Sequence, residues 1–286
     1  MMSWYIFAIL ALLFIGMQRF LYKVSAERNC NTAWTTFYFM ATVTILSTTL
    51  FILQGAPVYN HNFLFLIAIV NSTTFLATTI SQIEALKRLP ASTVYPLIRL
   101  SLVLVVIFSL IFFEDTLSEF QLLGILFAII AIAILTRQFS SDKNPGKNIK
   151  YAPIFVFIAV LSSSISTISS KFAALYTNKM AFIALSYAAS TIFSFGLRNK
   201  LHNEKIHSNH KEAFVIGCII GFINFAGFYL YLKALSEGPL SIVASIVGMH
   251  FVISVILSSL IYREKLSPLQ KIGISLTIFS IILLRL

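Results

Sequence analysis

Long apolar runs separated by short polar stretches fill almost the whole chain of 286 residues. A helix needs about 20 mostly apolar residues to cross a bilayer, and ten runs have this length. The connections between the runs are too short for a soluble domain. The pattern therefore predicts an all-α membrane protein with ten transmembrane helices, at residues 3–22, 33–53, 62–86, 91–113, 118–137, 151–175, 180–197, 213–235, 240–262 and 268–285.

The composition supports this interpretation. Hydrophobic residues make up 58% of the chain and charged residues only 11%, whereas a soluble domain carries roughly 25% charged residues. The net charge of +11 resides in the short segments between apolar runs. That placement is typical of charges that orient a protein in a membrane, so we expect the lipid bilayer, and not nucleic acid, as the partner.

Two parts of the chain repeat at one offset. The stretch from Ala85 to Val94 resembles the stretch from Ala234 to Val243, and Phe113–Ser118 lies over Tyr262–Ser267 at the same offset of 149 residues. A constant offset across two helices predicts two homologous halves of five helices each, roughly residues 1–140 and 150–286. Because five is odd, the second half is expected to enter the membrane inverted.

The basic residues predict an orientation. Of the 21 lysines and arginines, sixteen lie in the segments after the first, third, fifth, seventh and ninth predicted helices, and only four lie on the other side. The positive-inside rule then places the basic loops in the cytoplasm and both termini outside, in a multi-pass protein of the cell (inner) membrane. Matching loops carry opposite charge: Glu114, Asp115 and Glu119 follow the fourth helix, and Arg263, Lys265 and Lys271 follow the ninth.

The repeated segments resemble the EamA-type signature of the drug/metabolite transporter superfamily. In that signature an apolar helix ends in Gly-Glu-x-Leu-Ser, and the next helix has an early glycine. Here Glu264-Lys265-Leu266-Ser267 precedes Gly273, and Asp115-Thr116-Leu117-Ser118 precedes Gly124. The glycine before the acid is absent from both halves, where Glu114 and Arg263 stand instead.

The resemblance implies a basket of ten helices with a central cavity between the halves, and transport by alternating access. It implies neither a cofactor nor an enzymatic activity. It also implies cytoplasmic termini, which is the reverse of the orientation that the charges predict.

Arg99 is the most informative single residue, because an arginine within a membrane span costs about 2.5 kcal/mol or more and should face a cavity or a partner. Ser92, Tyr95 and Arg99 are spaced three and four apart and share one helix face. We predict that this face lines the substrate site and that Arg99 binds an anionic group. The alternative is a structural role for Arg99, paired with Glu84 or with helix-end carbonyls, or extended to the interface.

Four further polar residues lie within predicted helices. His250 could carry a proton, and Gln82, Tyr231 and Asn224 could line the cavity. The alternative for all four is hydrogen bonding between helices.

Cys30 and Cys218 match no metal-site spacing. His202, His207 and His210 lie in one loop and could bind a metal, but the polar character of the loop disfavours this, so no metal site is expected.

These features favour a secondary-active transporter of small organic metabolites, with an amino acid or another carboxylate-bearing solute as substrate and possible coupling to protons or a counter-solute. The alternatives are a multidrug exporter, or a membrane enzyme or receptor without transport. Export of lipophilic cations by a buried carboxylate is disfavoured, because the first predicted helix contains no acidic residue. A membrane enzyme is disfavoured because no catalytic group of residues is visible.

Overall fold

The computed structural model describes residues 3–28, 30, 32–55, 57–58, 60–86, 98, 100–137, 152–201, 210–261 and 267–286. These parts of the chain form helices joined by turns and contain no strand, which confirms the predicted all-α class for them. The helices are α1 (Ser3–Glu27), α2 (Thr32–Gln54), α3 (His61–Leu86), α5 (Ser101–Phe112), α6 (Glu119–Arg137), α7 (Ala152–Tyr176), α8 (Lys179–Leu201), α9 (His210–Glu237), α10 (Leu240–Gly248), α11 (Phe251–Ile261) and α12 (Pro268–Leu283).

Seven helical stretches are long and apolar enough to cross a membrane: α1, α2, α3, α7, α8, α9 and the pair α10–α11. The described residues also include three shorter apolar helices, which lie in α5, α6 and α12. Each of the ten predicted segments contains one of these helical stretches. A multi-pass membrane protein is thereby confirmed, and a crossing by each of the three shorter helices stays a prediction.

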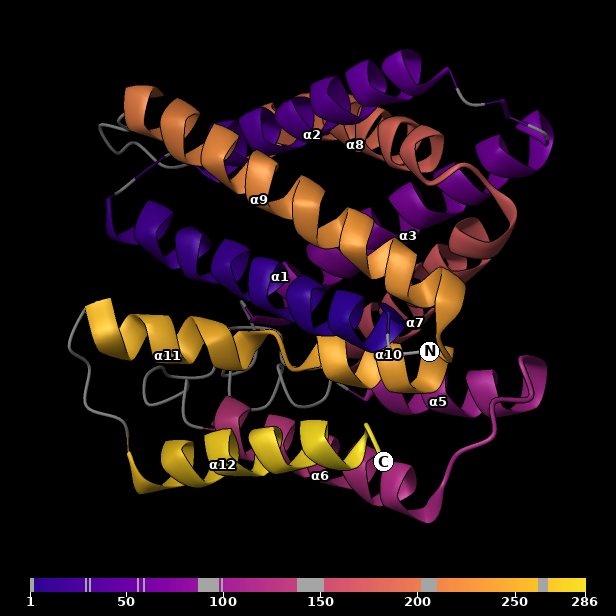
Figure 1. Ribbon diagram of the computed structural model, residues 1–286. Helices are drawn as coiled ribbons and strands as arrows, with labels where there is room; N and C mark the ends of the chain where they lie inside the picture. The colour runs from indigo at the N-terminus through magenta and orange to yellow at the C-terminus, as the bar shows by residue number, and fades with distance from the viewer. Residues whose placement is uncertain are drawn as a thin grey trace.

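The helices pair across the two halves of the chain. In Figure 1, α1 lies between α9 and the α10–α11 pair, and it contacts all of them. In the exchanged arrangement α7 takes the place of α1 and α3 takes the place of α9, and these two helices are also in contact. Equivalent helices of the two halves also pack on each other at two places, α2 on α8 and α6 on α12. In addition α5, from the predicted fourth helix, packs on α10, from the predicted ninth helix. Exchanging the two halves therefore leaves the pattern of helix contacts largely unchanged.

The helix starts repeat as well. The helices α1, α3 and α6 begin at residues 3, 61 and 119, and α7, α9 and α12 begin at residues 152, 210 and 268. Each of these pairs is separated by 149 residues, the offset found in the sequence motifs.

Glycines allow α9 to approach α2 closely. A Cβ atom at Gly217 would lie 2.8 Å from the Cβ of Tyr38, and one at Gly221 would lie 2.6 Å from the Cβ of Thr42. Small residues four apart permit this kind of contact between membrane helices, where packing rather than the hydrophobic effect drives association.

The predicted ninth helix, 240–262, is interrupted in the middle. Backbone hydrogen bonds from Met249 N to Ile246 O (3.1 Å) and from His250 N to Val247 O (3.0 Å) span three residues instead of four. A continuous helix was therefore the wrong expectation for this segment. Gly248 lowers the helix propensity at this point, and the Nδ1 atom of His250 lies 2.8 Å from the Val247 carbonyl oxygen.

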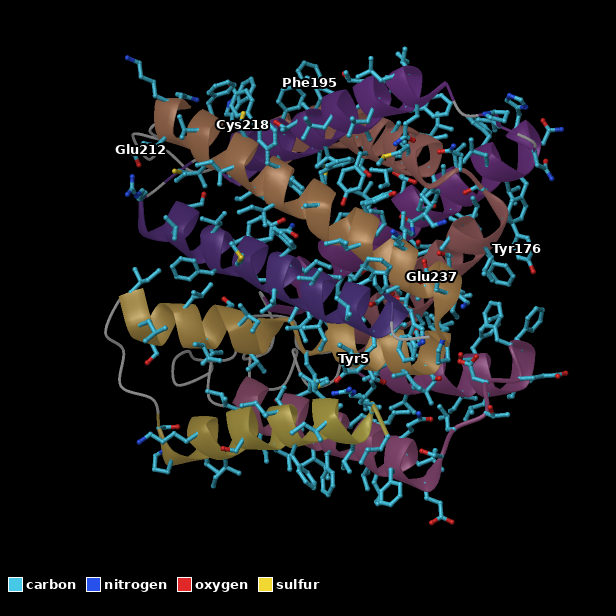
Figure 2. All side chains as sticks on the ribbon, in the orientation of Figure 1. Tyr5, Tyr176, Phe195, Glu212, Cys218 and Glu237 are labelled. Atoms are coloured by element: carbon cyan, nitrogen blue, oxygen red, sulfur yellow. The ribbon has the colours of Figure 1, made fainter. Side chains whose placement is uncertain are left out.

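The two ends of the bundle differ in what they carry. The terminal end, as we call the end with both chain termini, also holds the start of α10 (Figure 1). There the Tyr5 hydroxyl donates to the Ile281 carbonyl oxygen at 2.9 Å. Figure 2 shows Tyr5, Tyr176 and Glu237 toward this end, and Glu212 toward the opposite one. At the opposite end, Arg28 and Glu212 form an ion pair at 3.6 Å.

Candidate functional site

A chain of hydrogen bonds crosses the middle of the bundle. The Tyr187 hydroxyl donates to Oδ1 of Asn224 at 2.6 Å. The amide nitrogen of Asn224 donates to Oε1 of Gln18 at 2.9 Å, and the amide nitrogen of Gln18 donates to the Tyr22 hydroxyl at 2.8 Å. We call these four residues the polar network. It joins α1 of the first half to α8 and α9 of the second.

The polar network has a direction. Asn224 and Gln18 each accept a hydrogen bond at the amide oxygen and donate one from the amide nitrogen. All three bonds therefore run in the same direction, from Tyr187 to Tyr22. The hydroxyl proton of Tyr22 has no acceptor among the described residues, and Tyr22 is partly exposed. The network therefore ends in a hydroxyl that can donate to a bound molecule.

Aromatic rings surround the polar network. Successive ring centroids lie 6.4 Å apart for Tyr22 and Phe39, 6.0 Å for Phe39 and Tyr187, and 5.8 Å for Tyr187 and Phe228. The guanidinium carbon of Arg19, an exposed residue, lies 5.7 Å from the centroid of the Tyr22 ring. The site thus combines apolar walls, neutral amides and one nearby positive charge.

Gly227 of α9 helps to position the polar network. A Cβ atom at Gly227 would lie 2.9 Å from the Cβ of Phe14, so the backbones of α9 and α1 run close together. One turn away, Asn224 and Gln18 are both buried and within hydrogen-bonding distance. Burial in an apolar bundle makes an unpaired amide costly, which favours the pairing that is observed.

The structure brings some of the predicted site residues together. Asn224 lies in the polar network. Tyr231 lies two turns further along α9, is 8% exposed, and is connected to Tyr187 through the ring of Phe228, whose centroid is 6.2 Å from that of Tyr231.

His250 lies at the interruption between α10 and α11. Its carbonyl oxygen would be 2.6 Å from a Cβ atom at Gly16, so the interruption packs on α1 two residues from Gln18.

The remaining predicted residues cannot be located in the same way. Arg99, Tyr95 and Ser92 lie outside the described residues. Gln82 belongs to α3, but its side chain is not among those that the structure describes. Their predicted roles in substrate binding therefore stay predictions.

The sequence interpretation missed three members of the polar network, namely Gln18, Tyr22 and Tyr187. Gln18 had a usable signal, because it is an amide in the apolar run of the first helix and such residues need a partner. Tyr187 gave no signal, since tyrosine is common in apolar runs and the sequence does not indicate which helix faces it.

A second buried amide serves as a comparison. The amide nitrogen of Asn71 on α3 donates to the Ser166 carbonyl oxygen (2.9 Å) and to the hydroxyls of Ser169 (2.9 Å) and Ser170 (3.1 Å) on α7. These partners belong to a run of small residues that lets α3 and α7 pack closely. This cluster ties helices together and has no bond to the polar network.

A bundle of apolar helices from two halves, with a hydrogen-bonded polar site between them, is the architecture of a multi-pass membrane transporter. The chain belongs to the EamA-like transporter family, whose model matches it twice, at residues 2–137 and 150–286. The two matches confirm the family that the sequence motifs resemble, together with its two-repeat architecture. The protein is accordingly a membrane transporter of small molecules.

The fold is also found among solved structures. One crystal structure is similar to the chain with a TM-score of 0.81 at 12% sequence identity, and the match covers 99% of this chain and 98% of the other. At this identity the similarity establishes the fold alone. No curated protein matches the chain.

Proposed function

We propose that the protein is a secondary-active transporter of small organic metabolites that works by alternating access, with the polar network at its substrate site. The observation that supports this most directly is the bond between Gln18 and Asn224, which joins the two halves in the middle of the bundle. A site at the interface of the halves can face one side of the membrane and then the other as the halves move.

The halves are proposed to be residues 1–140 and 150–286, with the second inverted relative to the first. The 149-residue spacing of helix starts and the exchange of contacts between α1–α9 and α3–α7 support this division. Two structurally equivalent halves provide two similar conformations of the whole, which is what alternating access requires.

The preferred substrate is a solute with a carboxylate, such as an amino acid. The Tyr22 hydroxyl and the Arg19 guanidinium provide a hydrogen-bond donor and a positive charge beside the polar network. Arg99 adds a second positive charge by its position in the sequence. A multidrug exporter is the second candidate, because the aromatic rings of Phe39, Tyr187 and Phe228 would suit an apolar body.

Transport by purified protein in liposomes tests this function. We expect uptake or release of at least one carboxylate-bearing solute from a panel of amino acids and carboxylic acids, with proton gradients or counter-solutes supplied in turn.

Arg99→Ala should reduce this transport by at least about tenfold without preventing membrane insertion, since it removes the charge predicted to bind the anion. Undiminished transport by this variant would remove Arg99 from the site. Transport of lipophilic cations alone would favour the multidrug exporter, and no transport of any solute would favour a receptor or enzyme.

The orientation is a separate proposal, with the basic loops in the cytoplasm and both termini outside. A fluorescent reporter fused after Leu286 in a bacterial inner membrane should then stay dark, and an alkaline phosphatase fused at the same place should be active. The physical reason is the excess of sixteen basic residues over four on the other side. Strong cytoplasmic fluorescence would show the opposite orientation, which is the one the family resemblance implies.

A further inference from the structure

A buried lysine binds the end of α9 at the terminal end of the bundle. Lys171 of α7 is 6% exposed, and its ammonium group donates to the carbonyl oxygens of Leu235 (2.6 Å) and Gly238 (2.8 Å). No carboxylate oxygen of a described residue lies within ion-pair distance of this ammonium. The last carbonyls of a helix have no partner within the helix and carry partial negative charge, so a cation there is stabilising.

A carboxylate binds the beginning of the next helix. Asp115, in the loop after α5, accepts hydrogen bonds at Oδ2 from the backbone N–H of Ser241 (3.2 Å) and from its hydroxyl (2.8 Å). The hydroxyl of Ser109 also donates to Oδ2 of Asp115. The first N–H groups of a helix carry partial positive charge, so an anion is stabilising at the start of α10. A cation and an anion from two other elements thus hold the two ends of one turn, residues 235–241.

The backbone before Asp115 is adapted to this contact. Glu114 has a φ of +51°, the one positive φ at a non-glycine position among the described residues. This left-handed conformation is unfavourable for residues with a side chain and favours glycine. Glu114 occupies the place of the signature glycine in the EamA motif, and Asp115 the place of its glutamate. The turn that the motif glycine would favour therefore directs the acid toward the helix start of the other half.

The turn at the terminal end is tightly packed in the bundle. Its apolar side chains Leu235 and Leu240 are completely buried. Because Asp115 belongs to the first half and Ser241 to the second, a relative movement of the halves that opens this end has to separate them. Lys171 and the carbonyls that it binds both belong to the second half, so that contact can persist and keep the turn in one shape.

We propose that Asp115 and Lys171 form the lock of the transport path at the terminal end, with Asp115 as the part that releases. Lys171 keeps the α9–α10 turn rigid and presents Ser241 to Asp115. Breaking the Asp115–Ser241 contact accompanies opening of this end. The lock rests on the proposed transport function, and both residues act as positioning residues that do not touch the solute.

Cysteine accessibility tests the lock without a transport assay. In a Cys30→Ser, Cys218→Ser background, Ser245→Cys places a thiol on α10 one turn beyond Ser241, at a completely buried position. A second probe, Arg19→Cys, lies beside the polar network on the part of α1 nearer the opposite end. Both are measured in nanodiscs with a hydrophilic maleimide, with and without Asp115→Asn. The matched control is Glu114→Gln, which removes the same charge from the adjacent, exposed residue.

We expect Asp115→Asn to raise labelling of Ser245→Cys by at least about tenfold, which corresponds to about 1.4 kcal/mol, and to lower labelling of Arg19→Cys. Glu114→Gln should change neither rate. No increase at position 245 would overturn the proposal. An increase at 245 without a decrease at 19 would also overturn it, because it would indicate local loosening instead of a movement of the two halves.

Three further variants keep the test decisive if Asp115→Asn does not fold. Ser241→Ala removes only the hydroxyl donor to Asp115 and should raise labelling at position 245 above that of the parent. Lys171→Met should raise labelling and Lys171→Arg should not, since arginine preserves the charge on the helix end. Unchanged labelling in Ser241→Ala, or equal labelling in Lys171→Met and Lys171→Arg, would contradict the lock. If the labelling changes as expected but no variant or parent transports any solute, the proposed function fails and the contact is a structural one.

Discussion

Asn224→Ala is expected to reduce the transport rate by at least about tenfold while the protein remains folded in the membrane. Asn224 both accepts from Tyr187 and donates to Gln18, so alanine removes two of the three bonds in the polar network. Gln18 and Tyr187 then lose the partner that fixes their orientation. A tenfold change corresponds to about 1.4 kcal/mol, which is within the usual cost of leaving buried polar groups unpaired, about 1–3 kcal/mol.

The effect on folding is expected to be smaller than the effect on transport. Hydrogen bonds between helices in membrane proteins contribute on average about 0.6 kcal/mol to stability, because the separated helices find other partners. We therefore expect a decrease of a few degrees in the melting temperature of the purified protein. The loss of transport is measured as the initial rate in liposomes for the solute identified by screening, and it is compared with the loss of stability.

Asn71→Ala is the matched control. Asn71 and Asn224 are the same residue type and are both 7% exposed, and each bonds to a neighbouring helix. Asn71, however, bonds only to the serines of α7. We expect Asn71→Ala to lower the melting temperature at least as much as Asn224→Ala and to leave transport nearly unchanged. Equal losses of transport in the two variants would show that the polar network has no special part in it.

The positions of the helices could be predicted from the sequence because one physical property determines them. A segment that remains in a bilayer must be apolar over about 20 residues and must satisfy its own backbone hydrogen bonds. The repeat was also readable, since the same 149-residue offset appears in the motifs and in the starts of α1 and α7. The helices follow from the local hydrophobicity of each segment, and the repeat follows from comparing two segments of the same sequence.

The contacts of the site could not be predicted in the same way. Gln18 and Asn224 are 206 residues apart, and only the pairing of α1 with α9 brings them together. In the sequence, Asp115 is a loop charge of the repeated motif, and Lys171 is one of the four basic residues on the side opposite the basic loops. Their binding to the two ends of one turn depends on where α7 and α5 lie against α9 and α10. Hydrophobic patterns determine which segments cross the membrane, but not which polar groups of different helices meet.

The interruption of the ninth helix illustrates the same limit. Residues 240–261 form one apolar stretch, and the sequence predicts one helix there. The interruption follows from Gly248, which weakens the helix, and from α1, which packs at Gly16 against the carbonyl of His250. A contact between distant segments thus decides a feature that the local sequence only permits.

Gly16→Ala is expected to lower the free energy of unfolding by about 3 kcal/mol, the upper part of the usual range for overpacking. The added Cβ would lie 2.5 Å from the Cβ of Ile253 and 2.6 Å from the His250 carbonyl oxygen. A backbone oxygen cannot rotate away as a side chain can, so α1 and α11 must separate. The expected result is a lower melting temperature, a lower yield of folded protein and weaker transport, because the separation also displaces Gln18, two residues along α1.

Gly248→Ala is the control at the same interruption. It distinguishes an effect of helix packing from an effect on bending of the α10–α11 junction. No atom lies within 4 Å of a Cβ atom at Gly248, so alanine fits, and it should stabilise the end of α10 by up to about 1 kcal/mol. If the α10–α11 junction bends during transport, a stiffer residue there slows the cycle, so we expect a lower transport rate together with a higher melting temperature. An unchanged transport rate in Gly248→Ala would show instead that the junction is static and that Gly16 matters for packing alone.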